Sequence, residues 1–473
     1  MPTRTQAIVL AAGRSSRFNT SAIKLSFTLC GQEMIRYPLN VLKALKIKTL
    51  VVVGYQQEII RGILDKYSYP VECVEQTIQK GTGHALLCTR PYWTEDTLLI
   101  LNGDVPLITE AHIAELMKRH RSTAATISFI ASYNADPSVI GYGRVIDNGE
   151  QVSIVEQREF TGDPARECRL NAGVYLIERA FLEDTLPSLE THPSGEIFIT
   201  DLIHKASEQK KKIEIVDIPF DHVRGINTLK ELWVAERLVR SDIINSWMAQ
   251  GVRFIAPESV VIDYDVTLSP DTVIGYGVQL LKGTQVGRKV TIDAFSVLDG
   301  AIIGDSAIIH SHSVISHASV HGMAQVGPFA RVHQHSTLHA ESVVGNFVEV
   351  SKTTLGHKSK AKHLTYLGQA QIGKEANIGA GTITCNYNGV SKHATIIEDG
   401  AFIGSNSALL APVTIGKEAI VAAGSTITES VPAQALAIAR QRQTTKLHYA
   451  PLIKGKHAQA PDKLKLKLAT QGS

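Results

Sequence analysis

A chain of 473 residues is too long for one hydrophobic core, since a domain usually takes about 100–200 residues, so the sequence predicts two or three domains. Its 48 basic and 45 acidic residues leave a formal charge of +3, which argues against a nucleic-acid-binding or anionic-membrane surface. No run of eighteen apolar residues occurs, and the first residues lead into an expected strand rather than a signal peptide. We therefore expect a cytoplasmic protein.

The cysteines are scattered along the chain and have no CxxC spacing. They are Cys30, Cys73, Cys88, Cys168 and Cys385. This distribution predicts free thiols in a reducing compartment and no zinc site.

The N-terminal region alternates apolar runs with amphipathic stretches. Residues 7–10, 49–53 and 97–101 are short apolar runs that suit buried strands, and residues 35–45 suit a helix. This alternation predicts a mostly parallel sheet with helices on both faces. Ligands of such sheets bind beyond the carboxyl ends of the strands.

Small residues and cations follow the first expected strand. Ala11, Ala12 and Gly13 come directly after it, and Arg17 and Lys24 lie a few positions further on. Backbone N–H groups and cations in this arrangement can cradle a phosphate. Small residues after a strand more often form only a tight turn. The motif alone is therefore weak evidence for a nucleotide site.

Two other loops suit the same site. Asn102, Gly103 and Asp104 follow the expected strand at 97–101, and the Asp104 carboxylate suits Mg²⁺ beside a nucleotide phosphate or caps a turn. The glycine-rich loop at 79–85 leads into an expected helix, where it would contact phosphate or base, or simply turn the chain.

Residues 262–427 repeat with a period of six. One apolar residue per hexad is followed in many hexads by glycine or an acidic residue. The apolar positions are Ile262, Leu268, Ile274, Leu280, Val286, Ile292 and Leu298, and later Ile397, Ile403, Leu409, Ile415, Val421 and Ile427. Each hexad predicts a short strand and a tight turn that bury their apolar residue only against the next rung. The pattern predicts a parallel β-helix.

Residues 229–248, which precede the repeat, predict an amphipathic helix that links the two regions or closes the first.

The motifs, in this order and spacing, resemble the bacterial bifunctional N-acetylglucosamine-1-phosphate uridyltransferase / glucosamine-1-phosphate N-acetyltransferase family. The resemblance covers nearly the whole chain. It implies a Rossmann-like α/β nucleotidyltransferase domain at 1–228, a linker helix at 229–249, and a left-handed hexapeptide β-helix with a basic C-terminal tail at 250–473. It also implies a homotrimer that makes UDP-N-acetylglucosamine for the cell envelope and binds neither nucleic acid nor membrane.

In the first domain, the resemblance implies that N-acetylglucosamine 1-phosphate attacks the α-phosphorus of UTP and releases pyrophosphate. Mg²⁺ would be held by Asp104 and Asn227, and no side-chain nucleophile is needed because the sugar phosphate is already an anion. The implied nucleotide and sugar contacts are Leu10, Ala11, Ala12, Gly13, Arg17, Lys24, Gln76, Gly81, Thr82, Asn102, Gly103, Asp104, Gly143, Glu156, Asn171 and Asn227.

In the β-helix, the resemblance implies acetyl transfer from acetyl-CoA to glucosamine 1-phosphate. His363 would be the base that removes the ammonium proton, because histidine titrates near neutral pH. Tyr366 and Asn377 would bind the acceptor. The implied acetyl-CoA contacts are Ala380, Asn386, Tyr387, Ser405, Ala423 and Arg440.

The chain departs from the family pattern at both sites. Ser15, Ser16, Phe18, Ile23 and Asn102 replace family residues around the nucleotide. At the acceptor, His333 and Ser351 stand where the family has an arginine and a lysine that grip the sugar phosphate. Two charge-assisted contacts of about 1.5–3 kcal/mol each would be lost.

Three functions stay open at this level. The first is the bifunctional enzyme. The second is a uridyltransferase whose β-helix is only a trimerising scaffold, which His333 and Ser351 favour. The third is a non-catalytic sugar-nucleotide-binding protein.

The histidine-rich segment at 310–339 predicts exposed or inter-rung histidines rather than a metal site. The lysine-rich tail beyond residue 452 would lie near the acetyl-CoA phosphates.

Overall fold

The computed structural model describes residues 4–13, 18, 22–136, 139, 141–163 and 166–453. Residues 14–17, with Arg17, and the lysine-rich tail from 454 onward lie outside this range. The chain divides into two compact units between Met323 and Ala324. Within the described part of the chain, no helix is long and apolar enough to cross a membrane. All five cysteines are free thiols, as the sequence predicted.

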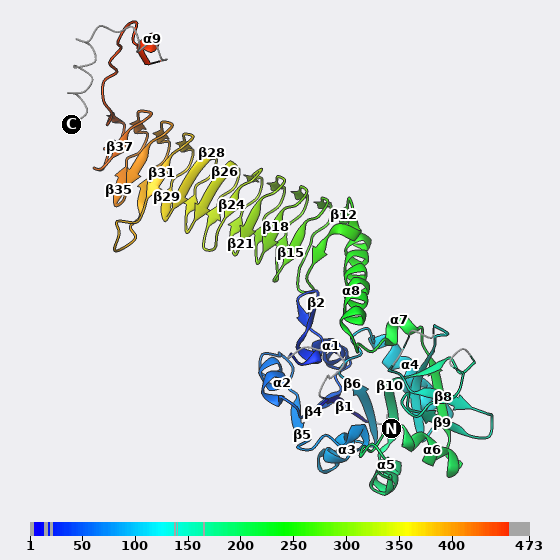
Figure 1. Cartoon of the computed structure of the whole chain (residues 1–473). Coiled ribbons are helices and arrows are strands. Elements are labelled where there is room, and N and C mark those ends of the chain that lie inside the picture. Colours follow the sequence, from blue (N-terminus) through cyan, green and yellow to red (C-terminus); the bar gives the residue numbers. More distant parts are fainter. Residues whose placement is uncertain are drawn as a thin grey trace. The chain divides into compact units, whose positions relative to one another are not determined.

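The first unit begins with a nine-stranded sheet whose main order is β11-β7-β10-β6-β1-β4-β5. Four neighbours from its centre, β10, β6, β1 and β4, can be followed in Figure 1. The strands are β1 (Thr5–Ala11), β4 (Lys48–Val53), β5 (Glu72–Glu75), β6 (Thr97–Asn102), β7 (Ile127–Tyr133), β8 (Arg144–Asp147), β9 (Val152–Val155), β10 (Arg169–Glu178) and β11 (Ile213–Asp217). A two-stranded hairpin, β2 (Thr28–Leu29) and β3 (Gln32–Glu33), lies apart from this sheet.

Helices cover the sheet, as the alternating pattern predicted. They are α1 (Arg36–Ala44), α2 (Gln57–Leu64), α3 (Gly81–Cys88), α4 (Glu110–Thr123), α5 (Arg179–Thr185), α6 (Asp201–Glu208) and α7 (Phe220–Val223), with short 3₁₀ turns between them. Alternate residues of β1 belong to different cores: Ala7 and Val9 to one, Ile8 to the other. Since strand side chains alternate between faces, β1 is buried on both sides.

The register of β1 and β6 decides where ligands can bind. The two strands are parallel, and Leu10 lies opposite Asn102. The loops that follow both strands therefore open at the same edge of the sheet. Strand β10 runs antiparallel to β6 and pairs Val174 with Leu101, which brings the first residues of β10 to that edge as well.

A long helix, α8 (Leu229–Ala249), follows this region and matches the amphipathic segment that the sequence predicted. Thr228 caps its N-terminus, because the Thr228 hydroxyl accepts a hydrogen bond from the backbone N–H of Glu231 at 3.2 Å.

The hexad repeats form the short parallel strands of a left-handed β-helix. In the first unit these strands are β12 (Arg253–Phe254), β13 (Val261–Ile262), β14 (Val273–Ile274), β15 (Gln279–Leu281), β16 (Gln285–Val286), β17 (Thr291–Ile292), β18 (Val297–Asp299), β19 (Ile302–Ile303), β20 (Ile308–Ile309), β21 (Val314–Ser316) and β22 (Ser319–Val320). The apolar hexad positions predicted from the sequence, from Ile262 to Leu298, are all buried.

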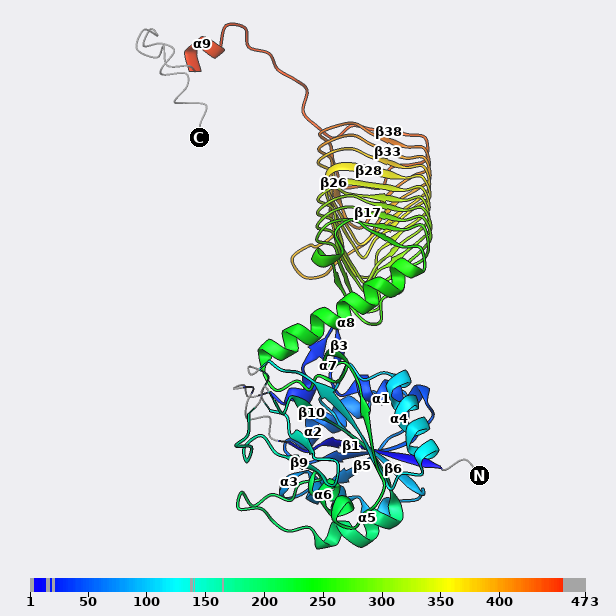
Figure 2. The same cartoon turned by 90° about the vertical axis from the view of Figure 1, so that its right-hand side faces the viewer.

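The second unit continues the repeat, and Figure 2 shows its rungs stacked one on another. Its strands are β23 (Gln325–Val326), β24 (Arg331–Val332), β25 (Thr337–Leu338), β26 (Val343–Ser351), β27 (Thr354–Leu355), β28 (Lys360–Gly368), β29 (Ala370–Ile372), β30 (Asn377–Ile378), β31 (Ile383–Cys385), β32 (Thr395–Ile397), β33 (Phe402–Ile403), β34 (Ala408–Leu410), β35 (Val413–Ile415), β36 (Ile420–Val421), β37 (Thr426–Ile427) and β38 (Leu436–Ala437). A short helix, α9 (Ala450–Ile453), follows.

Tight turns of the β-helix use left-handed backbone at residues that are not glycine. Phe295, His312, Phe329 and Phe347 have φ of 59°, 60°, 54° and 56°. Left-handed backbone costs about 1–2 kcal/mol for a residue with a Cβ. Burial of one apolar side chain per hexad offsets this cost, since a fully buried valine, leucine or isoleucine contributes about 1.5–3 kcal/mol.

Candidate functional site

A cavity of about 660 Å³ opens at the shared edge of β1, β6 and β10 in the first unit. Most of the residues that the sequence assigned to the uridyl site line it: Leu10, Ala11, Ala12, Gly13, Lys24, Gln76, Gly81, Thr82, Asn102, Asp104, Gly143, Glu156, Asn171 and Asn227. Gly103 lies beside the cavity and donates its backbone N–H to Leu10 O at 3.0 Å. Arg17 falls outside the described residues.

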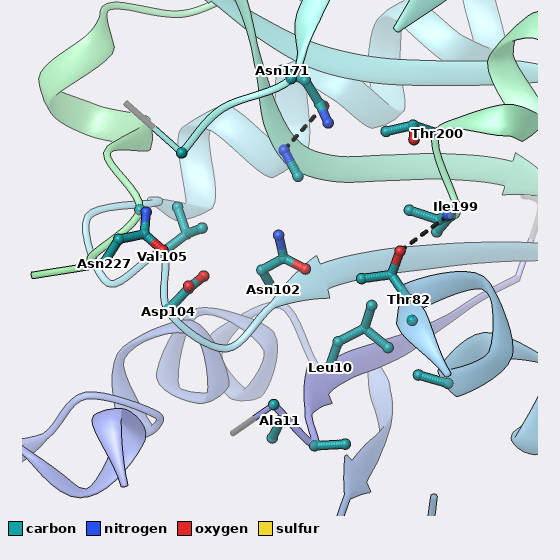
Figure 3. Close-up of a pocket in the computed structure, with 18 of the residues that line it drawn as sticks. Leu10, Ala11, Thr82, Asn102, Asp104, Val105, Asn171, Ile199, Thr200 and Asn227 are labelled. Carbon is teal, nitrogen blue, oxygen red and sulfur yellow. Dashed lines mark hydrogen bonds between the residues drawn. The ribbon is translucent and has the colours of Figure 1, made fainter. Parts of the chain in front are cut away.

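The glycine-rich loop is fixed by contacts with residues 197–199. Gly81 has a φ of +91°, and a Cβ there would collide with the carbonyl oxygen of Ile197. The backbone N–H of Gly83 donates to that same oxygen at 2.8 Å. The Thr82 hydroxyl accepts a hydrogen bond from the backbone N–H of Ile199 at 3.0 Å, as Figure 3 shows. The loop therefore needs glycine at position 81 both for its conformation and for its close packing.

Gln76 is buried beside this loop. Its Nε2 donates to Gly81 O at 3.1 Å and lies 3.0 Å from Nδ1 of His84. With its NH₂ group held in this way, the amide is fixed in one orientation beside the cavity, which suits recognition of the edge of a base.

Asn171 is held at both ends of its amide. Nδ2 donates to the hydroxyl of Tyr175 at 2.6 Å, and Oδ1 accepts from the backbone N–H of Gly173 at 3.1 Å. The pairing of β10 with β7 shifts register between Asn171 and Tyr175, so a bulge sets the position of this side chain. Asn102 lies near the middle of the cavity in Figure 3 and makes no side-chain hydrogen bond to any described residue.

Glu156 places a carboxyl group in the cavity wall. Its Oε1 accepts a hydrogen bond from the Thr200 hydroxyl at 2.9 Å. Burial raises the pKa of Glu156, and the nearby carboxylates of Asp201, Glu159 and Glu196 raise it further, against the lowering effect of the Thr200 bond.

Asp104 and Asn227 lie at one end of the cavity, away from Thr82 and Thr200 (Figure 3). The Asp104 carboxylate forms an ion pair with the Lys24 ammonium, and both side chains are partly exposed to the cavity. A carboxylate and an amide offer the oxygen ligands that Mg²⁺ prefers, and Mg²⁺ usually keeps waters and substrate phosphates as its remaining ligands. No cluster of three or more His, Cys, Asp or Glu that could hold a metal occurs in the described part of the chain. Asp104 and Asn227 supply two side-chain oxygen donors, which fits a metal whose other ligands are substrate phosphate and water.

No individual role was predicted from the sequence for several residues that line the cavity, among them Tyr142, Tyr175, Glu196, Ile199, Thr200 and Gly225. Tyr142 is buried, and its hydroxyl bonds both the backbone N–H and the carbonyl of Gly225, at 2.7 and 2.9 Å. This contact ties the segment of Gly143 to the segment of Asn227. No periodic signal marks Tyr142, because its partner is 83 positions away.

The acetyl-transfer residues lie on the second unit. His363 is exposed on β28, and its Nδ1 is 3.0 Å from the amide oxygen of Asn346 on β26. A proton on Nδ1 makes this contact a hydrogen bond and leaves Nε2 with a free lone pair, which a general base requires. Tyr366 lies three residues further along the same strand, opposite Ile383 of β31. Asn377 pairs with Lys360 of β28 and Phe402 of β33.

Three of the predicted acetyl-CoA residues follow one corner of successive rungs. Ala380 O accepts from the backbone N–H of Asn406, and Ser405 O accepts from that of Gly424, at 2.7 and 2.8 Å. These bonds place Ala380, Ser405 and Ala423 in a column, and the Arg440 side chain lies beside Gly424. Asn386 and Tyr387 lie in a loop that leaves the rungs. Asn386 Nδ2 donates to Gln369 Oε1 at 3.0 Å, whereas the Tyr387 ring is exposed.

Comparison with known proteins agrees with both units. A family model described as "MobA-like NTP transferase domain" matches residues 7–165, and one described as "Bacterial transferase hexapeptide (six repeats)" matches residues 394–429. The bifunctional protein GlmU of Thermotoga maritima is 38% identical over 445 residues, which cover 93% of this chain and 97% of the relative. The chain belongs to the bifunctional GlmU family.

Other GlmU proteins are about as similar. Those of Pelobacter propionicus and Exiguobacterium sibiricum are each 36% identical, over 447 and 450 residues, and 96% and 99% of their lengths are covered. As a GlmU protein, the chain is a transferase with a nucleotidyltransferase half and a hexapeptide acetyltransferase half that serve UDP-N-acetylglucosamine synthesis. The expected fold and bifunctional activity are confirmed. The scaffold-only alternative gains no support from these comparisons.

Proposed function

We propose that the cavity of the first unit joins N-acetylglucosamine 1-phosphate to the uridylyl group of UTP. An oxygen of the sugar phosphate forms a bond to the α-phosphorus, and the bond from that phosphorus to the pyrophosphate oxygen breaks. The observation that carries this proposal is the convergence of fourteen residues expected at a sugar-nucleotide site on one cavity. Catalysis then rests on positioning and charge neutralisation rather than on a covalent intermediate.

Each wall of the cavity has a separate task in this proposal. Gln76 and the Gly81 turn face the uracil, since their amide groups are held in fixed orientations. Glu156, Asn171 and Gly143 hold the acetylated amino sugar. Lys24 neutralises phosphate charge. Asp104 and Asn227 would hold Mg²⁺, which when bound supplies further neutralisation of the phosphates.

In the second unit, we propose that the amine of glucosamine 1-phosphate attacks the thioester carbonyl of acetyl-CoA. His363 Nε2 takes the proton that the attacking nitrogen loses, and the new amide bond forms as the carbon–sulfur bond of the thioester breaks. The coenzyme A sulfur then takes a proton from the His363 imidazolium and leaves as a thiol. The Asn346 contact supports this role because it holds the imidazole in the tautomer that a base needs. Tyr366 and Asn377 contact the acceptor, and the corner column from Ala380 to Arg440 contacts acetyl-CoA.

The proposed functional boundaries are 1–228 for uridylyl transfer, 229–249 for the linker helix and 250–473 for acetyl transfer. Helix α8 spans the middle segment, and the hexad strands follow it. We further propose that the assembly is a homotrimer built on the β-helix and that both reactions run in the cytoplasm, where UTP and acetyl-CoA are available.

Two substitutions should separate the activities. Asp104→Asn removes the proposed metal carboxylate and should lower Mg²⁺-dependent pyrophosphate release from UTP and N-acetylglucosamine 1-phosphate at least about a hundredfold. His363→Ala should leave that release unchanged. It should lower thiol release from acetyl-CoA with glucosamine 1-phosphate about 10²–10⁴-fold.

Each variant is the control for the other, because each assay reports on one site. Pyrophosphate release that survives Asp104→Asn, or thiol release that survives His363→Ala, would contradict the corresponding assignment. A protein that releases neither product in its unmodified form would contradict the proposed function as a whole.

A further inference from the structure

The imidazole of His192 lies between two carboxylates that belong to different segments of the first unit. Its Nδ1 is 3.0 Å from Oε1 of Glu159, and its Nε2 is 2.9 Å from Oδ2 of Asp201. The ring of Phe198 packs beside it, with ring centroids 4.8 Å apart. Both ring nitrogens face acceptors, and only an imidazolium can donate to both at once.

The two segments lead directly to the sugar side of the cavity. Glu159 belongs to the turn that starts at Glu156, since its backbone N–H donates to Glu156 O at 2.9 Å. Asp201 begins α6 immediately after Thr200, whose hydroxyl donates to the Glu156 carboxylate. The segment between His192 and Asp201 also carries Glu196, Ile199 and Thr200 into the cavity wall.

The loop that begins at His192 is tied to itself as well. The backbone N–H of His192 donates to Glu196 O at 2.9 Å, and that of Gly195 donates to His192 O at 2.8 Å. Movement of the imidazole would therefore be passed to Glu196 and, through Asp201, to Thr200.

The protonation state of His192 decides whether the negative charge of the carboxylates around it is balanced. Burial lowers the pKa of His192, but hydrogen bonds and charge from Asp201 and Glu159 outweigh burial and raise it above its usual value. Glu156 and Glu196 add two further carboxyl groups to this region, and Lys205 is the cation of α6 that interacts with Asp201. Loss of the proton would leave these carboxylates to repel one another.

We propose that His192 is a positioning residue for the sugar phosphate, because its imidazolium joins Glu159 to Asp201 and so fixes Glu156 and Thr200 relative to one another. This inference rests on the proposed function, since it requires that the Glu156 side of the cavity binds the acetylated amino sugar. UTP, which faces the Gly81 and Lys24 side, should depend less on His192, because the Gly81 loop is held by Ile197 and Ile199 rather than by His192 itself.

The sign of the pH effect follows from the raised pKa. The imidazolium contacts are fully present below the usual histidine pKa of about 6.5 and are lost as the pH rises through the raised value. The KM for N-acetylglucosamine 1-phosphate should therefore increase from about pH 6.5 into the weakly alkaline range. The KM for UTP should change less.

The test compares the full-length protein with His192→Gln by pyrophosphate release, with both KM values measured between about pH 6 and pH 9. At pH 6.5 the variant should raise the KM for the sugar phosphate about three- to tenfold, the effect of losing one or two partly exposed charge-assisted bonds. The KM of His192→Gln for the sugar phosphate should then rise less with pH than the KM of the unmodified protein does. The KM for UTP and kcat should stay within about twofold.

His204→Gln is the matched control. It removes another histidine–carboxylate contact of the same helix, His204 with Glu208 at 3.1 Å, which is exposed and does not reach the cavity. Its pH profile should match that of the unmodified protein. Glu159→Gln, which keeps the contact of His192 with Asp201, should raise the sugar-phosphate KM less than His192→Gln does.

A second readout does not depend on activity. Hydrogen exchange measured by mass spectrometry at one pH should be faster in His192→Gln for residues 156–160 and 192–201, and unchanged for residues 97–101 of β6. An unaltered pH profile in His192→Gln, or an equal rise in both KM values, would overturn the inference. Failure of the unmodified protein to release pyrophosphate would instead count against the proposed function, and the exchange data would still decide the role of His192.

Discussion

At the scale of single residues, the proposed acceptor end of the β-helix carries His333 and Ser351 where the family resemblance leads us to expect two cations. His333 Nε2 lies 2.7 Å from Oε1 of Glu349, and Glu349 faces Tyr366 in the register of β26 and β28. A paired carboxylate therefore stands beside the proposed acceptor site. Arg331 is exposed on the same outward side of β24, because the buried Val332 separates it from His333. Its Cα lies opposite that of Glu349 in the register of β24 and β26.

Restoring both family cations should strengthen acceptor binding. The double variant His333→Arg/Ser351→Lys should lower the KM for glucosamine 1-phosphate at least about tenfold, because each charge-assisted phosphate contact contributes about 1.5–3 kcal/mol. Thiol release from acetyl-CoA at varied acceptor concentration measures this. The KM for acetyl-CoA should not change. An unaltered acceptor KM would mean that other groups already hold the phosphate.

At the scale of elements, one β-helix strand shows why the hexad repeat is informative. Ile302 and Ile303 are adjacent on β19, yet Ile302 is 52% exposed and Ile303 is 2% exposed. Ile303 lies opposite Val286 on β16 and Val320 on β22, so its burial is made by the rungs on either side. A rung in isolation could not bury this side chain, which is the reason that the repeats stabilise one another.

The same pair gives a test with a built-in control. Ile303→Ala should destabilise the β-helix by about 2–5 kcal/mol, because it leaves a cavity in a packed column. Ile302→Ala removes the same atoms from the outer surface and should cost less than about 1 kcal/mol in an isolated chain. Thermal unfolding followed by calorimetry would compare them. Equal destabilisation by both variants would contradict the inward placement of Ile303.

At the scale of the whole molecule, each unit carries a set of residues suited to one reaction. Every described residue that lines the uridyl cavity belongs to the first unit, and the proposed acetyl-transfer residues lie in the second. Large apolar side chains on the outer surface of the second unit, including Phe402 and Ile420, are exposed in the single chain. Exposed apolar surface of this kind is typical of an interface between copies.

The expected assembly is a trimer. Light scattering on the purified full-length chain should give three times the mass of one chain. Replacing Phe402 and Ile420 together with lysine should shift the mass toward that of one chain, because charged residues resist burial. Thiol release should fall in that variant if acetyl-CoA is held by more than one copy, while pyrophosphate release should persist. A monomeric unmodified protein would contradict the prediction.

The hexad period and the alternation of apolar and amphipathic segments predicted the fold class of both halves, and the family resemblance predicted most of the residues that line the uridyl cavity. The hexad period predicted which residues of the β-helix are buried, because a strand and its turn set inward and outward positions locally. The order of the N-terminal motifs predicted residues such as Leu10 and Asp104, because parallel strands bring their carboxyl ends to one edge.

The contacts between distant segments became evident only in the folded chain. His192 meets Glu159 across 33 positions, Tyr142 meets Gly225 across 83, and a register shift in β10 sets the position of Asn171. None of these contacts has a period or a local motif, because each depends on how loops pack once the sheet has formed. The sequence thus predicted most of the residues that line the cavity, and the folded chain decided which residues hold them in place.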